Sequence, residues 1–400
     1  MRYYTTNLTL GHTLDMSTRT VFDKIIDNIQ LPCDAIHTTV NNFHEIDNFK
    51  LNEKIVVIGV DDPMEYRPEY NWWAKTPTPE LFYTLYQIAS DRPDTTFVFL
   101  LPGRFWKTKH FAPLTNTRVI DFTLGQGDRS YHTVKAVEKN FESNKIGISL
   151  NRQMRVHRIS LISLLYGLEL DKSCIISAVH LYKQLSKLDS TEYLDHSDWQ
   201  FDPEHDPIKY AMQRGFERIV SEYKSKENFQ PRDRDVFITQ PGTDIVIDYA
   251  VDRNFEEELR PLYQNSFVEL VSNRLYSEPT VSIDEKMTNS VYGQNFPILI
   301  GSVGTVALYR DSGIDVFDDV VDHAYDNIAN PIDRLYRAVV DNQHLFTDIQ
   351  KTKQLWLDRQ DRFEKNVAYC QEDLYNYYEQ YILSECNREI PDLLTQAFDE

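Results

Sequence analysis

Short apolar runs rich in β-branched residues alternate with helical patterns over the first 145 residues of the chain. The spacing of apolar residues predicts helices at 18–29 and 79–90. Strands are predicted at 2–9, 35–40, 54–60, 95–101 and 117–123. Because strands that alternate with helices are joined by right-handed crossovers, this order predicts an α/β domain with a largely parallel sheet.

A second set of alternating elements begins with the strand KIGISL at 145–150 and a helix from about residue 156. Its later strands are predicted at 173–179, 235–239, 266–271 and 296–301. The polar stretch 188–232 predicts an insertion, and 331–390 is almost continuously helical in pattern. Two α/β domains in series, followed by helices, account for this organisation.

Composition narrows the classes of protein that these domains can form. The 400 residues are 41% hydrophobic, which is enough to bury more than one core. A net charge of −20 opposes non-specific attachment to nucleic acid or anionic membranes, although it is compatible with a local basic cleft. The chain has no apolar run of the roughly 18 residues that span a bilayer, and no apolar signal core at its start. The sequence therefore predicts a soluble, cytoplasmic protein.

Several common sites are missing from the sequence. The cysteines, at 33, 174, 370 and 386, lack the spacing of a zinc site or a disulfide framework. The phosphate-loop, GxGxxG, GxSxG and HExxH motifs are absent, which disfavours P-loop hydrolases, simple dinucleotide enzymes, α/β-hydrolases and zincins. The turn 301–304 carries two glycines after a predicted strand, but its spacing is not that of a fingerprint. No metal site is predicted.

The run from Asn151 to Arg158 follows a predicted strand and opens a helix. It contains Arg152, Arg155 and His157, and its three guanidinium groups would lie near a helix amino end, where they could bridge phosphate oxygens. The alternative is a solvated loop whose arginines pair with the surplus carboxylates of this acidic chain. The sequence leaves both interpretations open.

A second candidate for anion binding is the turn that contains Glu285 and Lys286. Ser282, three residues before Glu285, resembles a capping box, so the turn could serve only to start a helix. However, a cation in the first helical turn opposes the helix dipole. Lys286 therefore indicates either an anionic ligand or a nearby carboxylate.

Candidate bases lie in the first domain, where Asp61 and Asp62 end a predicted strand. Carboxylates at this position face a cleft, and the nearby Trp72–Trp73 pair could raise their pKa toward general-base duty. The alternative is that they only form a turn before Pro63.

The loop after the strand at 95–101 mixes basic and aromatic side chains, among them Arg104, Trp106 and Lys107. Such mixing can stack against and steer an acceptor, including a nucleic acid. A solvated loop without a binding role is the alternative.

These elements together resemble a known family. The resemblance begins with the Glu285–Lys286 turn and helix, followed by FPILIG and a helix ending at DSGIDVF. This order resembles the donor half of two-domain glycosyltransferases. It is most similar to fucosyltransferase-like proteins and to putative glycosyltransferases of tailed bacteriophages. The phage proteins also carry an N-x-x-x-R-x-H-R element, matched here by Asn151, Arg155, His157 and Arg158. The likeness covers about residues 145–345. One departure is Asn273, where relatives tend to have a glutamate.

The resemblance implies a GT-B architecture, with two Rossmann-like domains facing across a cleft. The acceptor-side domain would be 1–144, the donor-binding domain 145–345 with its insertion at 188–232, and the helices of 346–400 would pack back on the first domain. A UDP- or GDP-linked sugar would be the co-substrate, and neither a cofactor nor a metal would be needed.

The resemblance also implies roles for the candidate residues. Arginines 152, 155 and 158 and Lys286 would stabilise the leaving diphosphate, while Glu285 would bind sugar or ribose hydroxyls. Asp61 or Asp62 would be the base, with His12 in reserve. The acceptor could be a hydroxymethylated pyrimidine in phage duplex DNA, in the host cytoplasm. A small sugar, a lipid-linked glycan or a protein acceptor is also open. A catalytically silent binding or virion protein of the same fold is the alternative.

Overall fold

The computed structural model of the chain describes residues 2–5, 29, 31–39, 51, 53–61, 80–101, 114–121, 135–151, 156–178, 207–224, 235–236, 247–248, 259–273, 276, 281, 283 and 285–390. The chain forms two compact units. The first contains Met1–His132, Glu278–Glu285 and Gln371–Glu400, and the second contains Thr133–Ser277 and Lys286–Cys370.

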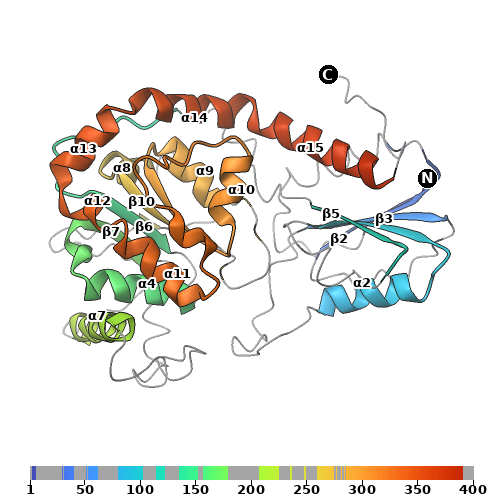
Figure 1. The fold of residues 1–400 in the computed structure, drawn as a ribbon, viewed down its shortest axis with the longest axis horizontal. Helices are drawn as coiled ribbons and strands as arrows, with labels where there is room; N and C mark the ends of the chain where they lie inside the picture. Colours follow the sequence, from blue (N-terminus) through green and yellow to red (C-terminus); the bar gives the residue numbers. More distant parts are fainter. Residues whose placement is uncertain are drawn as a thin grey trace. The chain divides into compact units, whose positions relative to one another are not determined.

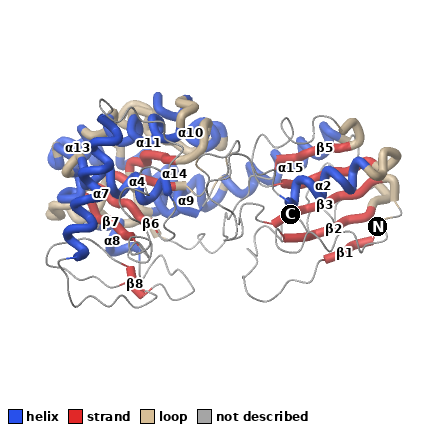
Figure 2. Tube along the Cα trace, turned by 90° about the horizontal axis from the view of Figure 1, so that it is seen from below, coloured by secondary structure: helices blue, strands red, loops and turns tan. Residues whose placement is uncertain are grey.

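The first unit contains a parallel five-stranded sheet in the order β1-β2-β3-β4-β5. Figure 2 shows these strands side by side. Their bounds are Arg2–Thr5, Asp34–Thr39, Ile55–Asp61, Thr96–Leu101 and Thr117–Asp121. The central strands are continuous apolar runs because both faces of a parallel sheet are covered, and Val57, Ile58 and Phe99 are fully buried.

Within the described residues, two helices cover this first sheet. Helix α2 (Glu80–Ser90) buries Leu85 and Ala89, and α15 (Leu374–Glu389) buries Ile382 and Cys386. Arg118 of β5 and Glu389 of α15 form an ion pair at 3.9 Å. The last helix of the chain therefore belongs to the first unit.

The second unit contains a parallel four-stranded sheet in the order β11-β10-β6-β7. The strands are β6 (Gly147–Asn151), β7 (Cys174–Ala178), β10 (Val268–Ser272) and β11 (Phe296–Ile300). These two parallel sheets and the helical carboxyl-terminal region confirm the predicted α/β class. The predicted strand 235–239 differs: its described part is β8 (Asp235–Val236), which pairs antiparallel with β9 (Ile247–Asp248) outside the main sheet.

Helices cover both faces of the second sheet. Figure 1 shows α4 (Val156–Gly167) and α11 (Pro331–Val340) on one face and α9 (Glu285–Tyr292) on the other. The shorter helices are η3 (Leu170–Ser173), α8 (Arg260–Gln264), α10 (Thr305–Asp311), η5 (Ala324–Asn327) and α12 (His344–Thr347). None of the described helices is long and apolar enough to cross a membrane.

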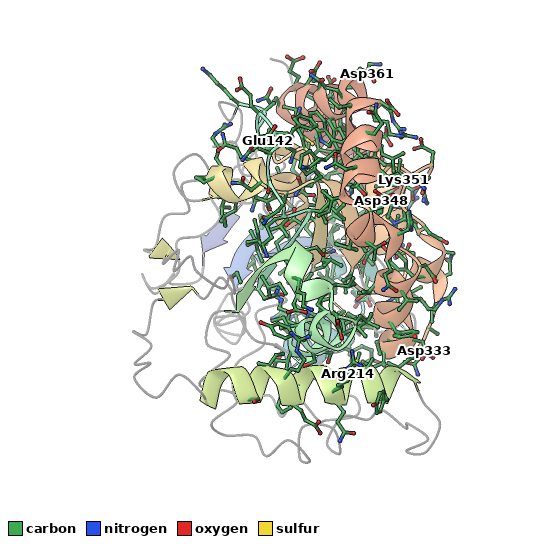
Figure 3. All side chains as sticks on the ribbon, turned by 90° about the vertical axis from the view of Figure 1, so that its left-hand side faces the viewer. Glu142, Arg214, Asp333, Asp348, Lys351 and Asp361 are labelled. Carbon is green, nitrogen blue, oxygen red and sulfur yellow. The ribbon has the colours of Figure 1, made fainter. Side chains whose placement is uncertain are left out.

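Helix α7 (Pro207–Lys224) lies within the stretch 188–232 that was predicted as an insertion. It packs closely on α4: a Cβ atom added at Gly215 would lie 1.7 Å from the Ser163 carbonyl oxygen. Arg214, labelled in Figure 3, donates to the Gly167 carbonyl at the end of α4 (2.6 Å). The described part of this stretch is thus a layer of the second unit.

The terminal helices divide between the two units. Helices α13 (Ile349–Leu357) and α14 (Gln360–Glu372) pack on the second sheet, where Trp356 stacks on Phe363 at 5.5 Å and donates to the Gln294 carbonyl at 2.7 Å. Asp348 caps the start of α13 by accepting from the Lys351 amide at 3.0 Å (Figure 3). The boundary between the units falls at the end of α14, and Gln371–Glu400, which contains α15, belongs to the first unit.

The side-chain nitrogen of Lys139 connects the segments that lead into the amino ends of β10 and β11. The Lys139 ammonium donates to the carbonyls of Tyr263 (2.9 Å), Ser266 (2.6 Å) and Gly293 (2.6 Å), and to Asn295 Oδ1. Burial lowers the pKa of Lys139 well below its usual value, and the Glu269 carboxylate opposes that shift. The four surrounding oxygens are all acceptors, which favours the protonated form.

Candidate functional site

The second sheet has a topological switch point between β6 and β10. From β6 the chain crosses to β7 on one side, and it returns to β10 on the other side before continuing to β11. Connections that leave two neighbouring strands in opposite directions open a crevice beyond their carboxyl ends, where open α/β sheets bind ligands. Asn151 ends β6, Ser272 ends β10 and Asn273 follows it, so these residues border that crevice.

Buried polar atoms gather at this carboxyl edge, defined here as Asn151, Ser272, Asn273 and Ser302. Each residue is at most 3% exposed, yet Asn151 Oδ1, Ser272 Oγ, Asn273 Oδ1 and Ser302 Oγ have no hydrogen-bond partner among the described residues. An unsatisfied buried polar group costs about 1–3 kcal/mol. Four such groups at one edge indicate a place where a ligand or ordered water completes the hydrogen bonding.

The orientation of the Asn151 amide is fixed by its own strand. Its Nδ2 donates to Ser149 Oγ at 2.9 Å and to the Ser149 carbonyl at 3.3 Å. Since the nitrogen is bound to a carbonyl, the opposite side of the amide presents Oδ1 as an acceptor. Such an oxygen suits a hydroxyl or an N–H of a ligand.

His157 and Arg158, at the start of α4, bind the end of β10 across the switch point. His157 Nε2 lies 3.1 Å from the Asn273 carbonyl, and Arg158 Nη2 donates to the Ser272 carbonyl at 3.2 Å. The His157 ring also stacks on Tyr276, with centroids 4.6 Å apart. Both side chains are buried, so these contacts hold the backbone that presents Ser272 and Asn273.

Among the described helices that follow carboxyl-edge strands, α4 has the start best suited to an anion. It has no acidic residue in its first turn, whereas α9 begins at Glu285. The start of α10 is already bound, because the Asp326 carboxylate accepts the amides of Val306 and Ala307, both at 3.1 Å. Burial raises the pKa of Asp326, and those two hydrogen bonds oppose the rise.

A hollow of about 590 Å³ lies along α10 and η5, and its lining contains none of the four carboxyl-edge residues. Its lining includes Asp318, Asp319, Asp322 and Asp326, together with Arg310, which pairs with Asp318 at 2.6 Å. This acidic surface is unfavourable for phosphate. Within the part of the chain that the structure describes, no group of three or more His, Cys, Asp or Glu side chains is arranged to hold a metal ion.

The structure brings together Asn151, His157 and Arg158 of the predicted site. Lys286 is half-buried in the first turn of α9; the backbones of Glu285 and Asp61 are described, but their side chains are not. The remaining predicted residues lie outside the described ones: His12, Asp62, Arg104, Trp106, Lys107, Arg152 and Arg155.

Sequence reasoning missed Ser272 and Ser302 of the carboxyl edge, and also Tyr276 and Asp326, which contact the segments around it. Ser302 lies in the glycine-bearing turn 301–304, which was the available signal. The roles of Tyr276 and Asp326 depend on contacts between segments far apart in the sequence. Asn273, noted as a departure from the resemblance, provides an amide oxygen where a carboxylate was expected.

No protein-family model matches this chain. No curated protein matches it either. Among solved structures, a trehalose-6-phosphate synthase matches with a TM-score of 0.39 and 14% sequence identity, over 93% of this chain and 76% of that one.

Proposed function

We propose that this protein is a glycosyltransferase that binds a nucleotide-sugar at the carboxyl edge of its second unit and transfers the sugar to an acceptor hydroxyl. The observation that carries the proposal is the switch point between β6 and β10, bordered by oxygens of Asn151, Ser272 and Asn273 that have no hydrogen-bond partner among the described residues. Amide and hydroxyl oxygens are suited to the hydroxyl groups of a sugar or a ribose. The resemblance noted from the sequence points to the same ligand.

The diphosphate would lie at the start of α4, where helix amides and the helix dipole favour an anion. Arg152 and Arg155, which immediately precede that helix, and Lys286 of α9 would supply positive charge. His157 and Arg158 would act indirectly, since they bind the carbonyls of Asn273 and Ser272.

In the reaction, the acceptor oxygen attacks the anomeric carbon while the bond from that carbon to the diphosphate oxygen breaks. The acceptor proton passes to a base, for which Asp61, Asp62 and His12 are the candidates. The negative charge on the departing nucleoside diphosphate is stabilised by the α4 dipole and the basic side chains, without a metal.

The acceptor we propose is a hydroxymethylated pyrimidine in duplex DNA, for which Arg104, Trp106 and Lys107 supply charge and stacking. Because the net charge of −20 opposes DNA binding, the positive charge of this loop must overcome the repulsion between DNA and the acidic chain. Sugar transfer to hydroxymethylated but not to plain duplex DNA supports this acceptor. Transfer to a small sugar or to a protein, but not to DNA, would show that the acceptor is that molecule and not a modified pyrimidine.

Calorimetric titration with UDP, GDP and their sugar conjugates tests the donor site. A ligand at about 100 times its Kd adds roughly 2.7 kcal/mol to stability, so thermal unfolding provides an independent readout. We expect Asn273→Leu to weaken binding at least tenfold, because it removes an acceptor at the switch point. The matched control is Ser163→Ala, which deletes another unpartnered buried oxygen at the α4–α7 contact and should leave binding unchanged.

Two results would count against the proposal. If no nucleotide or nucleotide-sugar binds the wild-type protein, the donor site does not exist. If Asn273→Leu binds as tightly as wild type, the ligand lies elsewhere. Binding without sugar transfer to any acceptor favours the alternative of a catalytically silent binding protein.

A further inference from the structure

A buried arginine on α11 connects three separate segments near the carboxyl edge. Arg334 is 3% exposed, and its nitrogens all donate to main-chain carbonyls. Nε donates to Gly301 (2.8 Å), Nη1 to Ile328 (2.5 Å) and Ala329 (3.3 Å), and Nη2 to Tyr276. A planar guanidinium can hold acceptors in several fixed directions at once, which a lysine ammonium cannot reproduce.

The segments that Arg334 binds carry the unpartnered oxygens. Gly301 directly precedes Ser302 in the turn that leaves β11, and Tyr276 follows Asn273 in the segment that leaves β10. Strands β10 and β11 are neighbours in the sheet. One side chain therefore fixes the distance between the segments that follow β10 and β11, which border the proposed ligand.

Aromatic stacking extends this connection to the switch point itself. The Tyr276 ring lies 5.4 Å from the Arg334 guanidinium and stacks on His157 on the α4 side. His157 in turn contacts the Asn273 carbonyl. Arg334, Tyr276, His157 and Asn273 thus form one continuous series of contacts from α11 to the end of β10.

We infer that Arg334 is a positioning residue for the donor site: it holds the segments after β10 and β11 so that Asn273 and Ser302 meet the ligand. This inference rests on the proposed function for the identity of the ligand. The claim that Arg334 orders these segments does not depend on the proposed function, because the contacts of Arg334 exist without any ligand.

Two measurements on Arg334→Lys test the inference. Amide hydrogen exchange without nucleotide reports the positioning directly, and the Asn273 amide, which donates to the Ile300 carbonyl at 2.8 Å, is the reporter. We expect its exchange to rise by about tenfold or more relative to amides of the first unit. Affinity for whichever of UDP or GDP binds wild type should fall by roughly 10- to 100-fold, as for other supporting contacts around a site.

Arg337→Lys is the matched control, because Arg337 is one turn away on α11 and pairs with Asp341 at 2.9 Å on the surface. It should change neither measurement. If Arg334→Lys fails to fold, Tyr276→Leu removes the ring while keeping the carbonyl that Arg334 binds, and it should change both readouts in the same direction by a smaller factor.

The outcomes separate the two proposals. Unchanged Asn273 exchange in a folded Arg334→Lys protein overturns the positioning role, with or without nucleotide binding. Increased exchange with unchanged nucleotide affinity also overturns it, because the segments then move without affecting the ligand. Wild-type protein that binds no nucleotide overturns the proposed function, while the exchange measurement still decides whether Arg334 orders these segments.

Discussion

The first unit orders its described strands β1-β2-β3-β4-β5, whereas the second orders them β11-β10-β6-β7. In the first sheet, each crossover moves one strand further in the same direction, so the described strands contain no switch point. In the second, the chain reverses at β6 and β10, which opens a crevice at the carboxyl ends. The strand order therefore supports the proposal that the ligand binds at the carboxyl edge of the second unit.

The two sheets also differ in what they bury. The described core of the first is nearly all apolar, and its buried Asp34 accepts from the Glu53 amide at 3.0 Å. The second sheet buries polar groups at both ends: at the amino end Lys139 binds four oxygens, and at the carboxyl end four oxygens lack partners among the described residues. Hydrogen-bonded polar groups at the amino end and the four oxygens at the carboxyl end are thus separated along the same strands.

The largest expected effect comes from removing the amino-end cation. Lys139→Met leaves several buried acceptors without a donor and should lower the free energy of unfolding by about 2–4 kcal/mol. Urea denaturation measures this loss. Lys353→Met is the control, because among the described residues the Lys353 ammonium donates to two carbonyls, those of Phe141 and Ser143, and its loss should cost about half as much.

Thiol labelling shows whether that loss is confined to the second unit. Cys33 in the first unit and Cys174 in the second are both fully buried, and burial raises their thiol pKa to about 11 and about 12. At pH 8 both thiols therefore react only when their surroundings open. Lys139→Met should accelerate labelling of Cys174 but not of Cys33, and equal acceleration of both would contradict the separation of the two units.

At the carboxyl edge we expect a smaller effect in the other direction, a gain in the free energy of unfolding. Ser272→Ala combined with Ser302→Ala removes two buried hydroxyls that lack partners within the described part of the chain, so the protein without ligand should gain about 1 kcal/mol of stability. Nucleotide affinity should fall in the same variant, because function and stability conflict at such sites. A loss of stability in urea would show that these hydroxyls are satisfied, and that the two ends of the sheet do not differ.

The sequence predicted the strands of both sheets closely where they are continuous apolar runs. The predicted ranges 54–60, 266–271 and 296–301 correspond to Ile55–Asp61, Val268–Ser272 and Phe296–Ile300. Such strands are buried on both faces, so their hydrophobic pattern does not depend on which neighbour they pair with. The order of the strands, which creates the switch point, depends on long-range pairing and could not be predicted from local pattern.

The candidate site was predicted only in part, for a similar physical reason. The stretch that contains His157 and Arg158 was identified as important, but the sequence suggested that Arg158 would bind phosphate. The structure shows both side chains bound to carbonyls of β10, more than 110 positions away. Arg334 was missed, although an arginine four residues before Ala338 on the buried face of α11 was a usable signal.

The smallest effect concerns Asp326, whose carboxylate accepts hydrogen bonds from the amides at the start of α10. Because burial raises the pKa of this carboxyl above its unfolded value near 3.8, the folded state holds the proton more tightly than the unfolded state. Its contribution to stability is then fully present at low pH and is lost as pH rises from about 3.8 through the folded pKa. Asp326→Asn should remove this dependence, so the stability of the variant relative to wild type should improve as pH rises, by less than about 1 kcal/mol.

Asp318→Asn is the control of opposite sign, since Arg310 lowers the pKa of Asp318 and the contribution of Asp318 to stability is lost as pH falls. Urea titrations between about pH 3.5 and 7 measure both slopes, and a common sign for the two variants would show that Asp326 is not held as a buried carboxylate at that helix start.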